Sequence, residues 1–138
     1  MTKRRSTLTG SWSGAYRYPT DELSEVVFNA QIEERDGAFI GSVQEPNAHE
    51  PELEVSVLTA DIEGTRNGLS IAFTKFYGAE AELDFAIRYE GEADEALTRI
   101  DGIWINPDWS GTFFMTRDDL GEEEAVELKV EAPIEIRK

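Results

Sequence analysis

Two charged side chains occupy positions that the alternating pattern of the sequence otherwise gives to apolar residues. Lys75 follows Phe73 at a spacing of two, and Glu45 follows Val43 in the same way. Because alternate residues of a strand share a face, both charges are predicted to point into an apolar interior. A buried charge is costly unless it is paired. Two interpretations stay open: a Lys75–Glu45 ion pair that plugs the interior, or a pocket in which Lys75 holds an anionic or carbonyl group.

Aromatic side chains are predicted to surround this pair. The candidate ligand-binding residues, all expected at one end of the fold, are Tyr16, Tyr18, Glu45, Lys75, Tyr77, Trp104 and Trp109. In the pocket interpretation, aromatic walls enclose a small organic or anionic ligand, and tyrosine hydroxyls orient it.

An enzyme is the alternative use of the same residues. Glu45 would act as general base and Lys75 or Tyr77 as general acid, provided that burial moved their pKa values toward neutrality. The chain has no cysteine and one histidine, His49, which excludes disulfides, thiolate chemistry and multi-histidine metal sites. No Ser-His-Asp arrangement or phosphate-binding loop indicates a reaction. We expect no catalytic residues, cofactor or metal site, and favour a binding protein over an enzyme.

The net charge limits the partners. Among 138 residues, 29 are Asp or Glu and 13 are Lys or Arg, for a net charge of −16, so nucleic acid and anionic membranes are poor partners. The apolar fraction of 40% excludes a wholly disordered acidic chain. No apolar run approaches the roughly 18 residues of a membrane span, and the basic residues 1–5 are not followed by a signal peptide's apolar stretch. We expect a cytoplasmic protein.

A hydrophobic period of two predicts strands, not helices, along most of the chain. The predicted strands are Gly10–Tyr18, Glu25–Glu34, Ala38–Glu45, Val55–Glu63, Leu69–Tyr77, Glu82–Glu90, Arg99–Asn106 and Ser110–Arg117. Asp36-Gly37 and Asn67-Gly68 are hairpin signals, since these residues tolerate positive φ. Eight sequential strands predict an all-β antiparallel fold, either an up-and-down barrel or a meander sandwich. Small residues among large aromatic ones favour the eight-stranded barrel.

Loop lengths distinguish the two ends of such a barrel. The turns after the second and fourth strands are short, whereas Pro19–Ser24, Pro46–Glu54 and Gly78–Ala81 are longer and lie together. Long loops at one end of a rigid barrel mark the mouth of a site. The candidate residues are predicted to point toward that mouth.

The chain is predicted to divide into a basic N-terminal extension, a barrel domain and an acidic tail, covering 1–7, 8–118 and 119–138. In the tail, apolar residues from Val126 to Ile136 alternate with charged residues and Pro133. A ninth strand and a disordered tail both stay open, and Pro133 would restrict a strand to an edge.

A structural or assembly module is the third functional interpretation. Outward positions carry the apolar residues Ile40, Val57, Phe76, Ile103, Ile105 and Phe114. The group on the seventh and eighth strands exceeds scattered surface hydrophobics. It would receive either the C-terminal tail or a second subunit, making a homo-oligomer.

Four segments resemble avidins in order and spacing. Leu8–Trp12 resembles the first avidin strand, and its Gly-x-Trp core is shared with lipocalins; Gly37–Ser42, Ile71–Tyr77 and Ile100–Trp104 follow. The resemblance covers residues 8–117 and implies the calycin architecture, an eight-stranded antiparallel barrel with a ligand pocket at one end. The Trp-Ser-Gly sequences at Trp12 and Trp109 also resemble small uncharacterised bacterial proteins.

Barrel closure is predicted to bring Trp12 beside Arg117. The start of the first strand lies next to the end of the eighth strand in an up-and-down barrel. Lipocalin-like barrels close their lower end with an arginine on the Gly-x-Trp indole, a cation–π contact with burial of the side-chain stem. The resemblance therefore implies a structural role for both residues.

The biotin-binding residues of avidins are not matched. Where avidins have an Asn two positions after the tryptophan, this chain has Gly14. Tyr18 stands near the place of a serine, Val43 in place of a tyrosine and Glu45 in place of a second serine. Each unmet hydrogen bond to the ureido group would cost ~1–3 kcal/mol, so we predict no tight biotin binding.

Overall fold

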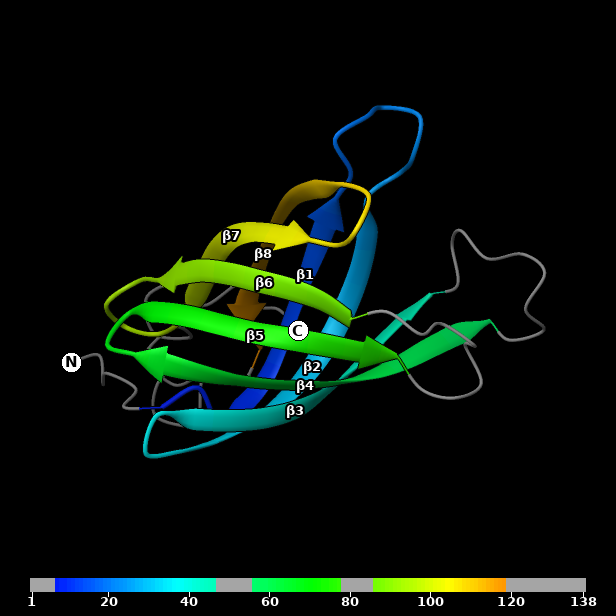
Figure 1. Ribbon diagram of the computed structural model, residues 1–138. Helices are drawn as coiled ribbons and strands as arrows, with labels where there is room; N and C mark the ends of the chain where they lie inside the picture. Colours follow the sequence, from blue (N-terminus) through cyan, green and yellow to red (C-terminus); the bar gives the residue numbers. More distant parts are fainter. Residues whose placement is uncertain (1–6, 47–55, 78–85, 119–138) are drawn as a thin grey trace, which may run out of the picture.

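The computed structural model describes residues 7–46, 56–77 and 86–118. They form the strands β1 (Gly10–Arg17), β2 (Val26–Arg35), β3 (Ala38–Pro46), β4 (Val57–Asn67), β5 (Ser70–Tyr77), β6 (Ala86–Ala93), β7 (Arg99–Ile105) and β8 (Ser110–Arg117). Each strand pairs antiparallel with the next, and β8 pairs with β1 to close the barrel (Figure 1). The predicted eight-stranded up-and-down barrel is confirmed.

Alternation along the strands separates the interior from the solvent face. In β2, Val26, Phe28, Ala30 and Ile32 are buried while the residues between them are exposed. The same pattern in the other strands produces one continuous core of aliphatic and aromatic side chains. This is the face assignment that a period of two predicts.

Glycines let neighbouring strands pass closely where the barrel is narrow. A Cβ at Gly14 would lie 2.0 Å from the carbonyl oxygen of Phe114, and one at Gly102 would lie 2.0 Å from that of Glu90. Either contact would push two strands apart. Glycine at these positions therefore permits the curvature that closes eight strands on themselves.

Two strands differ from the sequence prediction by more than one residue at an end. The fourth predicted strand stopped at Glu63, whereas β4 continues to Asn67, which pairs with Ser70. The sixth was predicted over Glu82–Glu90, whereas β6 is described over Ala86–Ala93, where Ala93 pairs with Ile100. Polar and charged residues continue these strands because the partner strand supplies the ladder bonds. Residues 1–6, 47–55, 78–85 and 119–138, and with them His49 and the tail, lie outside the described residues.

The end that holds the β2–β3 and β4–β5 turns, called here the closed end, is capped by Trp12 and Arg117. The indole Nε1 of Trp12 donates to the carbonyl oxygen of Leu8 at 2.9 Å. The Arg117 guanidinium lies 4.7 Å from the Trp12 ring centroid. It donates to the carbonyl oxygens of Leu97 and Thr9 at 3.0 and 2.6 Å. The side chains of Trp12 and Arg117 thus hold the backbone segments that cross this end of the barrel.

The closed end also holds an ion pair, between Arg66 and Glu34, that the sequence analysis does not predict. The buried carboxylate of Glu34 accepts hydrogen bonds from the Arg66 guanidinium at 2.9 Å and from the Leu8 N–H at 2.7 Å. One more step of the alternation that buries Val26, Phe28, Ala30 and Ile32 reaches Glu34. Burial opposes ionisation of Glu34, but the bonds from Arg66 and Leu8 outweigh it and keep its pKa below the ordinary 4.5.

We predict that Glu34 makes folding stability depend on acid pH. A lowered folded-state pKa contributes stability above the unfolded value, and this contribution disappears as the pH falls through the folded value. Urea unfolding should show the free energy of unfolding decreasing below about pH 4.5. Glu34→Gln should flatten this decrease, whereas Glu33→Gln, at its exposed neighbour, should leave it unchanged. Equal pH profiles for Glu34→Gln and the wild-type chain would contradict the assignment.

Candidate functional site

Lys75 and Glu45 form a buried ion pair near the opposite end of the barrel, called here the open end. Lys75 on β5 and Glu45 on β3 point into the interior, and the Lys75 Nζ lies 3.0 Å from Glu45 Oε1. The two residues are 2% and 4% exposed. The ion-pair interpretation of the sequence therefore describes the contact between them.

Two tyrosine hydroxyls complete the hydrogen bonding of the carboxylate. Tyr16 on β1 donates to Glu45 Oε2 at 2.7 Å, and Tyr77 on β5 donates to the same oxygen at 2.9 Å. With the bond from Lys75, Glu45 accepts three hydrogen bonds, one from a side chain on β1 and two from side chains on β5. Such partners offset the cost of removing a carboxylate from water.

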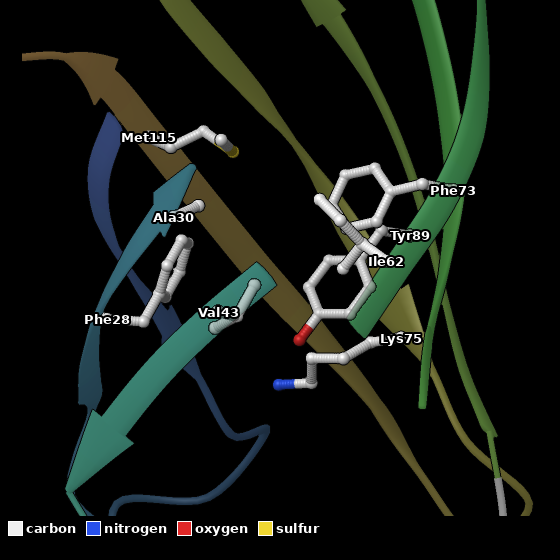
Figure 2. A pocket seen from close by; sticks show the side chains of 8 residues that line it. All are labelled: Phe28, Ala30, Val43, Ile62, Phe73, Lys75, Tyr89 and Met115. Atoms are coloured by element: carbon white, nitrogen blue, oxygen red, sulfur yellow. The ribbon is translucent and has the colours of Figure 1, made fainter. Parts of the chain in front are cut away.

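Aromatic rings surround the ammonium group. The Lys75 Nζ lies 4.6 Å from the ring centroid of Tyr16, 4.8 Å from that of Tyr77 and 5.4 Å from that of Tyr89. In Figure 2 the Tyr89 hydroxyl and the Lys75 ammonium reach into the same space. These distances are in the range of cation–π contacts. Tyr89 belongs to the predicted inward face but was not among the predicted site residues.

The pKa shifts in this cluster keep Lys75 positively charged, and Tyr16 and Tyr77 protonated, at neutral pH. Burial favours the neutral amine of Lys75, but Tyr89, Tyr77 and Glu45 outweigh it and raise the lysine pKa above its usual value. Burial raises the pKa of Tyr16 and of Tyr77, and the negative charge of Glu45 adds to both shifts. The lysine thus stays an ammonium and both tyrosines stay donors. None of these three pKa values moves toward neutrality, as acid–base catalysis would require.

An aromatic cluster borders the ion pair toward the rim. Tyr18 lies with its ring centroid 5.4 Å from that of Trp104, 5.7 Å from that of Trp109 and 5.9 Å from that of Tyr16. Trp104 is buried and donates its Nε1–H to the carbonyl oxygen of Arg17 at 2.9 Å. Trp109 is 40% exposed, so the cluster runs from the core to solvent.

A tight turn positions Trp109 at the rim. The Asn106 side-chain oxygen accepts hydrogen bonds from the backbone N–H groups of Asp108 and Trp109, both at 2.8 Å. The seven predicted site residues thus fall into two adjoining groups. Tyr16, Glu45, Lys75 and Tyr77 form a bonded cluster, and Tyr18, Trp104 and Trp109 form the rim cluster.

Side chains fill the interior beneath the ion pair. The internal cavity there measures about 10 Å³, the space of about one water molecule. Its walls, drawn in Figure 2, are Phe28, Ala30, Val43, Ile62, Phe73, Lys75, Tyr89 and Met115. The wide cavity around Lys75 that the pocket interpretation anticipated is not found in this part of the described interior.

Five of the six apolar residues predicted to face outward are exposed, and Phe114 is the exception. Ile103 and Ile105 on β7 are exposed. Phe114 on β8 is only half-buried, and the Arg99 guanidinium covers its ring at 4.8 Å from the centroid. Among the described residues, no group of three His, Asp or Glu side chains is arranged to hold a metal ion. The described part of the chain also contains no helix long and apolar enough to cross a membrane.

Comparison with known proteins identifies the fold. No protein-family model matches the chain, and no curated protein matches its sequence. The structure is similar to a redesigned β-barrel, b11L5F_LGL, with a TM-score of 0.66 and 12% identity, covering 86% of this chain and 100% of that one. It is also similar to the redesigned β-barrel mFAP1 bound to DFHBI, with a TM-score of 0.61 and 10% identity, covering 80% of this chain and 94% of that one. At these identities the likeness concerns the barrel alone.

We predict strong coupling between Lys75 and Glu45 in folding stability. Lys75→Met leaves a buried carboxylate without its cation and should cost about 3–5 kcal/mol of unfolding free energy. Adding Glu45→Gln to Lys75→Met should recover part of that loss, because the amide oxygen still accepts from the tyrosines and carries no charge. Urea unfolding of the two single variants and the double variant measures the coupling.

The exposed Arg88–Glu90 pair on β6 is the control for this double-mutant cycle. Its side chains are 56% and 48% exposed, and exposed pairs contribute about 0–1 kcal/mol. A coupling energy between Lys75 and Glu45 no larger than that of Arg88 and Glu90 would contradict the role of the buried pair.

Proposed function

We propose that this protein is a non-enzymatic barrel that binds a small organic molecule at its open end. The observation that carries the proposal is the rim cluster, in which half-buried Tyr18 lies between buried Trp104 and exposed Trp109. Aromatic rings at 5–6 Å spacing, graded from buried to exposed, suit a planar molecule that stacks against them. Tyr77, also half-buried, supplies a further wall.

The chemistry of the cluster favours an uncharged ligand over an anionic one. Lys75, the cation at this end of the interior, donates to Glu45, so an anion would have to compete with that carboxylate. The net charge of −16 also repels anions over a range limited by salt. A neutral planar molecule with one hydrogen-bonding group avoids both costs.

Related barrels support the proposal by analogy. The redesigned barrel mFAP1 is bound to DFHBI, so a barrel of this architecture can hold a small organic molecule. We further propose an avidin-like or lipocalin-like relationship, based on the Gly10-x-Trp12 sequence and the Trp12–Arg117 contact. Tight biotin binding is not part of the proposal, since Gly14, Val43 and Glu45 replace the neutral hydrogen-bonding groups.

Three naphthalene probes with different charges test this function. Naphthalene-2-carboxamide is neutral, naphthalene-2-carboxylate is anionic and 2-naphthylmethylammonium is cationic. We predict saturable binding of the carboxamide, observed by calorimetry and by quenching of tryptophan fluorescence, and weaker binding of the carboxylate. Absence of saturable binding for all three probes would refute a planar-ligand site. If the carboxylate bound more tightly than the carboxamide, the ligand class would be anionic and the proposal of a neutral ligand would be wrong.

A pair of matched variants locates the site. Trp109→Ala should weaken carboxamide binding by roughly 2- to 12-fold, the loss of one aromatic contact. Phe76→Ala removes an aromatic side chain of similar exposure, 43%, from the outer face of β5 and should leave the affinity unchanged. Equal losses in both variants would indicate nonspecific adsorption rather than a rim site.

A further inference from the structure

The barrel wall is divided at the open end between β2 and β3. The ladder that joins them ends at the pair Asn29 and Gln44. Beyond it, β2 continues to Val26 in register with β1, and β3 continues to Pro46 in register with β4. In Figure 1 the β3–β4 pair extends away from β2 at this end. Pro46 has no N–H to donate, which disfavours extension of the ladder across the gap.

A groove of about 450 Å³ lies at this division. Val27 and Val57, both exposed, form apolar parts of its outer walls. Gly14, Phe28 and Glu45 also line it, although all three belong to the inward-facing set of the strands. Inward-facing residues are therefore reached from the outer surface of the barrel at this place.

A thin partition separates the groove from the interior. Phe28 lines both the groove and the internal cavity. Glu45 lines the groove and is bonded to Lys75, which lines the cavity. The Phe28 ring also stacks on Tyr16 with centroids 6.3 Å apart, and Tyr16 holds Glu45. Movement of the Phe28 ring and of the Glu45 carboxylate would open the groove toward the inner cavity and toward Tyr16.

We propose that the gap between β2 and β3 is a lateral portal, closed by Phe28 and Glu45, through which the ligand passes from the side of the barrel to the aromatic residues of the open end. The proposal rests on the proposed small-molecule function. It adds a description of the ligand: a narrow, uncharged molecule that carries an N–H or O–H group. Among the described residues, Glu45 Oε1 accepts one hydrogen bond, from Lys75, and a carboxylate oxygen can accept a second. The apolar body of the ligand passes between Val27 and Val57.

Disulfide staples test the portal, because the chain has no cysteine of its own. Val27→Cys with Pro46→Cys closes the gap when oxidised. Gln31→Cys with Ser42→Cys places a staple on a pair of the existing ladder outside the groove and serves as the matched control. Stopped-flow tryptophan fluorescence with naphthalene-2-carboxamide gives the association rate constant for each variant, oxidised and reduced.

Oxidation of the portal staple should slow association at least about tenfold, as expected for a gated entry, while oxidation of the control staple leaves the rate unchanged. Equal rates in the oxidised and reduced portal variant, with binding intact, would overturn the portal alone. Absence of carboxamide binding in the wild-type chain and in every variant would overturn the proposed function and the portal with it.

Phe28→Leu gives a second measurement that needs no disulfide. A smaller side chain in the partition should speed association of the same probe, and circular dichroism checks that the barrel is intact. If the stapled chain does not fold or does not oxidise, this variant decides. An unchanged or slower rate in folded Phe28→Leu would overturn the portal.

Discussion

The carboxylate of Glu45 holds the open end of this barrel together. Its three hydrogen bonds come from Tyr16 on β1 and from Lys75 and Tyr77 on β5, so β3 is joined to strands that are not its ladder neighbours. The bonds therefore cross the lumen. Glu45, Lys75 and Tyr16 are buried and Tyr77 is half-buried, and each needs the others to offset its lost hydration. This mutual dependence fixes the positions of the aromatic rings above the cluster and of Phe28 beside it.

The two ends of the barrel use charge in different ways. At the closed end, Arg117 donates to backbone carbonyl oxygens and Glu34 accepts from a backbone N–H, so the chain itself is tied down. At the open end the bonds join side chain to side chain. Side chains can exchange partners by rotation, whereas backbone groups held on both sides cannot. The side-chain bonds of the Glu45 cluster can therefore rearrange with less change of the backbone than the bonds of Arg117.

Much of the fold and part of the site follow from the period of two along the sequence. That period assigns Lys75 and Glu45 to one interior, and the turn at Asn67 fixes the register of β4 against β5. The filled interior could not be predicted, since it depends on how Phe73, Tyr89 and their neighbours choose rotamers. The division between β2 and β3 was also beyond pattern analysis, because alternation reports which face a residue takes and not where a ladder stops.

The seam between β1 and β8 has a kinetic consequence. Every other ladder joins strands that are adjacent in the chain, and each of those can form as a local hairpin. The seam instead joins residues such as Ser13 and Asp118, separated by 105 positions. Its loop-closure entropy is the largest of any ladder, so we expect the β1–β8 ladder to form after the hairpins. The Trp12–Arg117 contact lies on this seam, and we expect it to form in the same late step.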